Sequence, residues 1–78
     1  MPTLSIVAIN AKNIIKAQGR KQYAVGESAG YSTSKFNAML NGRKTITVYD
    51  VIRLANALNV TPNVLFGLEP YDKASQAS

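Results

Sequence analysis

Apolar positions recur with the period of an α-helix in several stretches of the chain, and small polar or glycine residues bound these stretches. The first stretch predicts a helix over residues 5–18, with Ser5 as its N-cap and Gly19 as its stop. Leu4 and Ile9 occupy the positions of a hydrophobic staple. The apolar stripe expected to face the core consists of Val7, Ala11, Ile14 and Ile15.

Two short helices are predicted next, over residues 22–29 and from the N-cap Ser32 to Leu40. Gly26 inside the first of them costs about 1 kcal/mol of helix propensity, so we expect another helix to pack closely there. Gly30 lies between the two helices and can take a positive φ. The inner face of the second of these helices is predicted to carry Phe36, Met39 and Leu40, and Asn41-Gly42 to end it.

A fourth helix has the clearest start. Thr47 and Asp50 stand three residues apart, as in a capping box, and Ile46 and Val51 hold staple positions. The helix is expected to end at Asn59. Its predicted apolar stripe consists of Val48, Val51, Ile52, Ala55 and Leu58.

A short fifth helix is predicted from the N-cap Thr61, with Pro62 at its first position and Gly67 as its stop. The stretch 45–48 is β-prone, but it is four residues long and includes the cap of the fourth helix. The pattern therefore predicts an all-α fold of five helices, with one domain over residues 1–68 and a short polar tail over 69–78.

The composition excludes several classes of chemistry. The 78 residues hold neither cysteine nor histidine, and the four acidic residues are scattered, so we expect no catalytic site, no metal site and no cofactor. The apolar stretch 4–9 is far shorter than the ~20 residues that span a bilayer, and no secretory cleavage site follows it. We expect a cytoplasmic protein with no membrane partner and no small-molecule ligand.

Positive charge is concentrated in the first two thirds of the chain. The net charge is +5, and residues 1–53 hold eight of the nine Lys and Arg residues but only two of the four acids. A localised basic surface indicates a polyanionic partner, and nucleic acid is the commonest one.

Residues 22–42 have the spacing of a helix-turn-helix, and from Ala11 to Gly67 the chain resembles the lambda-repressor-like, Cro/CI-type (XRE-type) DNA-binding domains. The motifs that carry the resemblance are Gln22, Gly26, Gly30, Ser32, Phe36, Met39 and Asn41-Gly42, followed by the block 51–67. The resemblance implies a five-helix domain with its helix-turn-helix at about 22–40, whose second helix enters the major groove of double-stranded DNA.

The chain departs from the family at three points. Lys21 stands where an N-capping residue is usual, and Asn59 stands where glycine is usual. Ile15 and Leu40 replace an internal Arg–Glu ion pair. A buried ion pair can be exchanged for packed hydrocarbon side chains at little cost in stability or with some gain.

On the predicted recognition helix, the residues opposite the inner face are expected to contact bases. Asn37 can pair with adenine, hydroxyl groups can bond to any base, and Ala38 or the Thr33 methyl group can touch a thymine methyl. The alternative is that Thr33 and Ser34 only begin a helix and that Asn37 is solvated. The expected base contacts are Ser32, Thr33, Ser34, Asn37 and Ala38.

Phosphate contacts are expected at the start of the motif, on the flank of the recognition helix and in the link that follows it. The residues are Gln22, Lys35, Asn41, Arg43 and Lys44. For Arg43 and Lys44 the alternative is a solvated loop. The basic residues of the first helix, with Arg20 and Lys21, are expected to have only a general electrostatic role.

The expected function is sequence-specific DNA binding by a transcriptional regulator, a repressor of the phage, prophage or small-operon kind located at the nucleoid. One domain covers one half-site, so a homodimer on DNA is expected. Candidates for its surface are Leu65, Phe66, Leu68 and Tyr71, of which Leu65 and Phe66 could instead close the core. The alternative function is an antitoxin-like protein-interaction module whose main partner is a toxin bound through the tail, with DNA binding secondary.

Overall fold

The computed structural model describes residues 5–71 and confirms the all-α fold. Within these residues there are five helices and no strand: α1 (Ser5–Ala17), α2 (Gln22–Ser28), α3 (Thr33–Leu40), α4 (Val48–Leu58) and α5 (Pro62–Phe66). Leu4 of the predicted staple and residues 72–78 of the predicted tail lie outside the described part.

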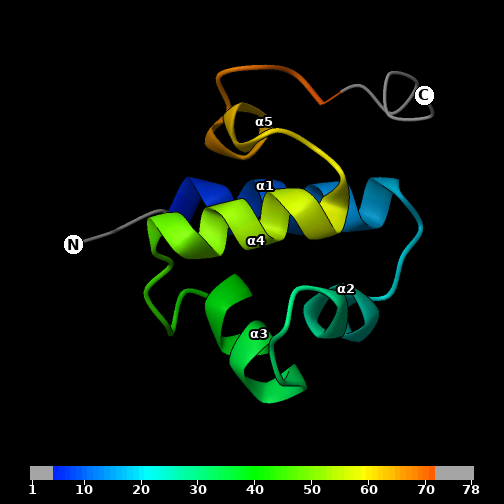
Figure 1. The fold of residues 1–78 in the computed structure, drawn as a ribbon, viewed down its shortest axis with the longest axis vertical. Helices are drawn as coiled ribbons and strands as arrows, with labels where there is room; N and C mark the ends of the chain where they lie inside the picture. The colour runs from blue at the N-terminus through cyan, green and yellow to red at the C-terminus, as the bar shows by residue number, and fades with distance from the viewer. Residues whose placement is uncertain (1–4, 72–78) are drawn as a thin grey trace.

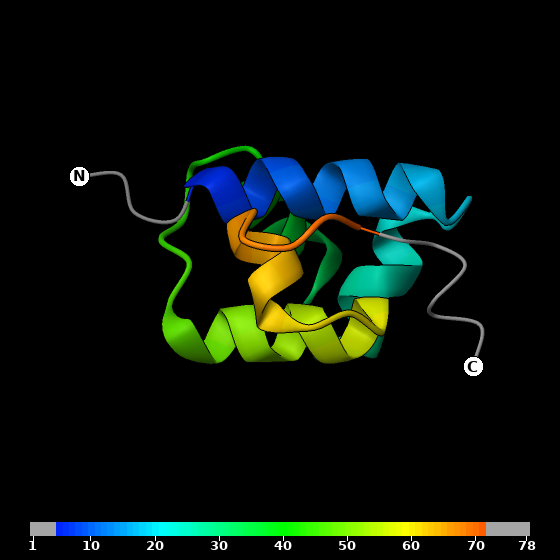
Figure 2. The ribbon, with the colours of Figure 1, turned by 90° about the horizontal axis from the view of Figure 1, so that it is seen from above.

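Helices α1 and α4 lie side by side across the middle of the molecule (Figure 1). The pair α2 and α3 packs against one side of this layer, and α5 covers the opposite side (Figure 1). Seen from above, α5 lies between α1 and α4 and contacts both (Figure 2). The helix-turn-helix is therefore left with one face free of the rest of the domain.

The predicted capping residues fix most helix ends. The Ser32 hydroxyl accepts a bond from the backbone N–H of Lys35 at 3.1 Å, and Thr47 and Asp50 form the capping box of α4. Asn59 ends α4 with φ of 60°, and Gly67 ends α5 with φ of 80°. These positive φ values explain why the chain has Asn and Gly at the two stops.

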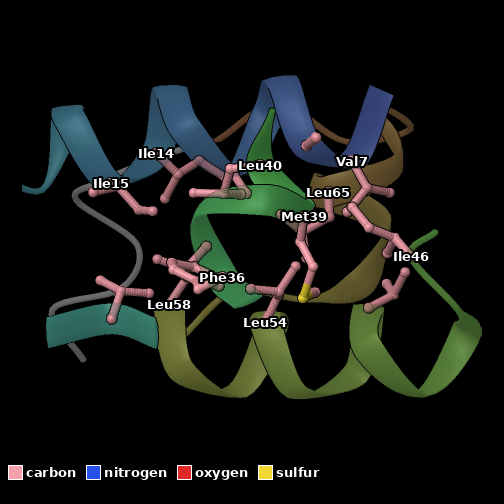
Figure 3. Packing of buried hydrophobic residues seen from close by; sticks show 14 of the residues in the cluster. Val7, Ile14, Ile15, Phe36, Met39, Leu40, Ile46, Leu54, Leu58 and Leu65 are labelled. Atoms are coloured by element: carbon pink, nitrogen blue, oxygen red, sulfur yellow. The ribbon is translucent and has the colours of Figure 1, made fainter. Parts of the chain in front are cut away.

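The core is built where the apolar stripes of the helices converge. Phe36, Met39 and Leu40 of α3 point into the space between α1 and α4, and Leu65 of α5 meets them there (Figure 3). All of the stripe predicted for the first helix is buried. The sequence thus identifies the core faces of α1 and α3 correctly.

The predicted stripe of the fourth helix is partly wrong. Val48 and Ile52 are 65% and 45% exposed, whereas Leu54 is fully buried. Positions 51, 54, 55 and 58 form one narrow stripe at 3.6 residues per turn, and Val48 and Ile52 fall on the same flank of it. Ile9 of α1 is likewise exposed, at 53%.

Several helix ends differ from the prediction by one residue. Helix α1 already begins at Ser5, which was expected to be the cap, and Gln18 follows its end. Ala29 is the C-cap of α2 and not its last residue. Thr61 is the N-cap of α5, but its hydroxyl donates to Glu69 Oε1 at 2.9 Å and forms no capping hydrogen bond with the backbone N–H groups of the helix.

Three side chains of α1 and of the segment after it bind carbonyl groups at the ends of other helices. Asn10 donates to the Leu65 carbonyl and Gln18 to the Leu58 carbonyl, both at 2.8 Å. Arg20 donates to the Ala57 carbonyl at 2.7 Å. These bonds satisfy carbonyl groups that a helix C-terminus leaves without a partner, and they hold α4 and α5 on α1.

Candidate nucleic-acid interface

The close approach of α2 and α3 depends on Gly26. A Cβ atom at this position would lie 2.6 Å from Cδ2 of Phe36, closer than carbon atoms can pack. Gly30 then turns the chain with φ of +90°, and the backbone N–H of Tyr31 bonds to the Gly26 carbonyl at 2.8 Å. Both glycines therefore have the roles predicted from the sequence: one permits packing and the other forms the turn.

Tyr31 anchors the turn between α2 and α3 to the rest of the domain. Its ring is 6% exposed and stacks on Phe36, with ring centroids 5.9 Å apart. Its hydroxyl donates a hydrogen bond to Asp50 Oδ1 of α4. Burial and this bond to a carboxylate raise the pKa of Tyr31 to about 12, so the hydroxyl keeps its proton near neutral pH.

The importance of Tyr31 was missed in the sequence analysis. The residue follows the predicted turn glycine, and Asp50 was recognised as part of a capping box, but 19 positions separate the two. No local pattern joins a turn residue to a helix cap at that distance in sequence. Only the packing of α4 on the helix-turn-helix brings them together.

The residues predicted to contact bases lie at the start and along one side of α3. Ser32, Thr33 and Ser34 are exposed, and Asn37 and Ala38 are half-buried. The inner residues Phe36, Met39 and Leu40 are buried on the other side of the same helix. The arrangement leaves a polar face of α3 accessible from outside, as expected.

Asn37 is the centre of a small hydrogen-bond network on this face. Its Oδ1 accepts one bond from Gln22 Nε2 at 3.3 Å and another from Asn41 Nδ2 at 3.0 Å. Asn41 Nδ2 also donates to the Asn37 carbonyl at 2.9 Å. Gln22, Asn37 and Asn41 were predicted separately as DNA contacts, and the structure joins them into one group.

A shallow hollow of about 550 Å³ opens between the start of α2 and the start of α3. Its lining brings three predicted base-contacting residues beside the predicted phosphate contact Gln22. It also includes the 57%-exposed Tyr23, which is not among the predicted DNA contacts. The lining residues are Arg20, Lys21, Gln22, Tyr23, Thr33, Ser34 and Asn37.

The remaining predicted phosphate contacts lie at two other places. Arg43 and Lys44 are exposed in the link after α3, and the backbone N–H of Arg43 bonds to the Ala38 carbonyl at 2.8 Å. Lys35 is exposed on α3, with its Nζ 5.5 Å from the centroid of the Tyr31 ring. Lys35 thus lies on the helix-turn-helix and Arg43 and Lys44 lie just after it, and none of the three lines the hollow.

Arg20 is placed differently from the other basic residues. Its guanidinium bonds to the Ala57 carbonyl and, at 3.3 Å, to Gln18 Oε1. A cation at the last turn of α4 also complements the partial negative charge of that helix end. Arg20 thus supports the packing of α4, although it borders the hollow.

Among residues 5–71 no group of three or more potential ligand side chains could hold a metal ion. Within the same part of the chain no helix has both the length and the apolar character needed to cross a membrane.

Comparison with known proteins agrees with the geometry. A family model described as a helix-turn-helix domain matches residues 15–65, which include α2, the turn and α3. Searches of curated proteins and of solved structures gave no significant match. Since the matched segment covers most of the chain and its helix-turn-helix is the one predicted from the sequence, this protein belongs to the family of helix-turn-helix domains, which is consistent with the Cro/CI (XRE) resemblance.

Proposed function

We propose that this domain binds double-stranded DNA sequence-specifically as a transcriptional regulator, a repressor of the phage, prophage or small-operon kind acting at the nucleoid in the cytoplasm. The observation that carries the proposal is the polar face of α3, where Thr33, Ser34 and Asn37 line one hollow with Gln22. A helix 8 residues long, exposed along one side, fits the major groove of B-DNA, which is about 12 Å wide.

In this proposal, five residues of α3 and its cap read the bases. The exposed hydroxyl groups can donate to or accept from any base edge, and Ala38 can touch a thymine methyl group. Asn37 can bind adenine through N6 and N7, but Gln22 and Asn41 already donate to its Oδ1. Reading adenine therefore requires Gln22 to release its long bond of 3.3 Å and turn to a phosphate. The proposed base contacts are Ser32, Thr33, Ser34, Asn37 and Ala38.

The proposed phosphate contacts surround this face. Gln22 lies at the start of α2, where backbone N–H groups add partial positive charge. Arg43 and Lys44 follow the C-terminal end of α3 in an exposed link, and the Asn41 amide lies beside them. Lys35 lies on the flank of α3, so the backbone of the DNA would be held at several points around one groove.

A symmetric dimer would place two copies of α3 in successive major grooves, one helical turn apart. Leu65 is fully buried and closes the core, so it is not available to a partner. Leu68 is 74% exposed, and Phe66 and Tyr71 are partly buried. We therefore propose Leu68, with the exposed edges of Phe66 and Tyr71, as the surface of a homodimer on DNA.

The first experiment measures the affinity for duplex DNA at a series of salt concentrations. The logarithm of the binding constant should fall linearly with the logarithm of the salt concentration, by about 0.9 for each cationic phosphate contact. The upstream DNA of the gene itself is the first duplex to test. An affinity independent of salt, or no binding to any duplex at low salt, would rule out DNA as the partner.

A second experiment separates base reading from backbone contact. Asn37→Ala should cost about 1 to 3 kcal/mol on the cognate site and much less on random DNA, whereas Arg43→Ala should weaken both similarly. Asn13→Ala and Lys16→Ala, at exposed positions of α1, are the matched controls and should change neither affinity by much. Equal behaviour of Asn37→Ala and Arg43→Ala on the two DNAs would show that these roles are wrongly assigned.

A further inference from the structure

Arg53 is an exposed cation of α4 that lies beside the helix-turn-helix and outside the set of predicted DNA contacts. Its guanidinium carbon is 5.6 Å from the centroid of the Tyr31 ring. Its Nη1 also lies 4.0 Å from the position that a Cβ atom would take at Gly30. The guanidinium is therefore held against the turn that joins α2 to α3, although it belongs to another helix.

Lys35 of α3 lies near the same aromatic ring. Its Nζ is 5.5 Å from the centroid of the same Tyr31 ring, so the two cations are gathered around one aromatic group. Attraction of each cation to the ring favours side-chain conformations that keep both positive charges near the turn. The ring itself is buried and stacked on Phe36, so its position is set by the packing of the core.

The charge of this pair is only partly compensated. The nearby Asp50 carboxylate accepts bonds from the Tyr31 hydroxyl and from the backbone N–H and hydroxyl of Thr47. It carries one negative charge against the two positive charges of Lys35 and Arg53. Two like charges held near each other favour binding of an anion, and a guanidinium suits phosphate oxygens because it can donate to two of them at once.

We propose that Arg53 is a further DNA-backbone contact, which acts together with Lys35 on the same short stretch of one strand beside the first turn of α3. This inference rests on the proposed function. Both cations lie within 5.6 Å of the centroid of the Tyr31 ring. Phosphates of one strand follow each other every ~3.4 Å along the helix axis, so the two cations can bind neighbouring phosphates. Helix α4 packs against α2, on the side of the helix-turn-helix that faces it in Figure 1, so a side chain of α4 at the turn can extend the basic surface of the motif.

The test compares Arg53→Gln with Lys12→Gln, which removes the same charge from an exposed position on α1. Arg53→Gln should lower the salt slope by about 0.9 for each subunit bound and weaken binding roughly eightfold per contact at 0.1 M salt, on cognate and random duplexes alike. Lys12→Gln should change the slope by much less. Arg53→Lys keeps the charge and should retain most of the slope.

Each outcome has a separate meaning. Absence of duplex binding by the unchanged protein contradicts the proposed function itself. The unchanged protein could instead bind duplexes with a steep dependence on salt while Arg53→Gln and Lys12→Gln lose equal affinity. That result contradicts only the role of Arg53, because the loss of affinity then depends on net charge and not on position. A loss in Arg53→Lys as large as in Arg53→Gln also contradicts it, and circular dichroism of each variant verifies that the helices are intact.

Discussion

The Tyr31 hydroxyl donates to Oδ1 of Asp50, the same carboxylate whose Oδ2 completes the capping box of α4. One acidic side chain therefore caps the start of α4 and also binds the turn of the helix-turn-helix. The start of α4 and the start of α3 are joined through it, because Tyr31 immediately precedes the α3 cap, Ser32. The orientation of α3 on the scaffold depends on this bond as well as on the apolar core.

Tyr31→Phe should separate the hydrogen bond from the packing of the ring. The phenyl ring keeps the stack on Phe36, but Asp50 loses one donor, and a bond to a charged group contributes about 1.5 to 3 kcal/mol. We expect the free energy of unfolding, measured with urea, to fall by that amount. Tyr23→Phe is the control, since Tyr23 is 57% exposed, and it should change stability by less than about 0.5 kcal/mol. Equal stability of the two variants would contradict the anchoring role.

Alkaline pH should remove the same contribution. The pKa of Tyr31 is raised from 10.0 to about 12, first by burial and then by the bond to Asp50, so the folded state holds this proton more tightly than the unfolded state. The stabilisation is complete below pH 10 and is lost as the pH rises towards 12. The difference in unfolding free energy between the unchanged protein and Tyr31→Phe should therefore shrink over this interval. A constant difference would be inconsistent with the raised pKa.

Asp50 should make stability depend on acid pH. Its burial opposes ionisation, but bonds from Thr47 and Tyr31 and the charge of Lys35 outweigh it, and the pKa of Asp50 lies below its ordinary value of 3.8. Its contribution is present above pH 3.8 and is lost as the pH falls through the lower, folded-state pKa. Asp50→Asn should lower the unfolding free energy at pH 6 and flatten this part of the acid profile. An unchanged acid profile in Asp50→Asn would assign the acid dependence to other carboxylates.

Gly26→Ala tests the contact between α2 and α3. Alanine should stabilise the isolated helix by about 1 kcal/mol, but its Cβ would lie 2.6 to 2.9 Å from three atoms of Phe36. Overpacking of this kind costs about 1 to 3 kcal/mol, so thermal unfolding should occur at a lower temperature. Phe36→Leu provides room, and the double variant should lose less than the two single losses added together. Strict additivity would show that the two side chains do not compete for space.

The sequence predicts the helices better than it predicts the contacts between them. The capping box of Thr47 and Asp50 and the inner face of α3 are local patterns, and the structure confirms both. The bond of Tyr31 to Asp50 depends instead on how α4 lies across the helix-turn-helix. A 3.6-residue period also does not define which residues at the margin of an apolar stripe are buried. For this reason Val48 was predicted to face the core but is exposed to solvent. Candidate DNA contacts followed from the motif, but their joining through Asn37 did not.

The exchange of an ion pair for Ile15 and Leu40 leads to the last prediction. Both residues are buried in the core cluster, and Leu40 lies against the face of α1 that carries Ile14 and Ile15 (Figure 3). Leu40→Glu alone would bury an unpaired carboxylate and should destabilise the fold by about 3 to 5 kcal/mol, as breaking a buried ion pair does. Adding Ile15→Arg should recover part of this loss, because the guanidinium could then pair with the carboxylate across the interface of α1 and α3. Urea unfolding measures both variants. A double variant no more stable than Leu40→Glu would show that the two positions do not face each other, and that the loss reflects burial of charge at Leu40 alone.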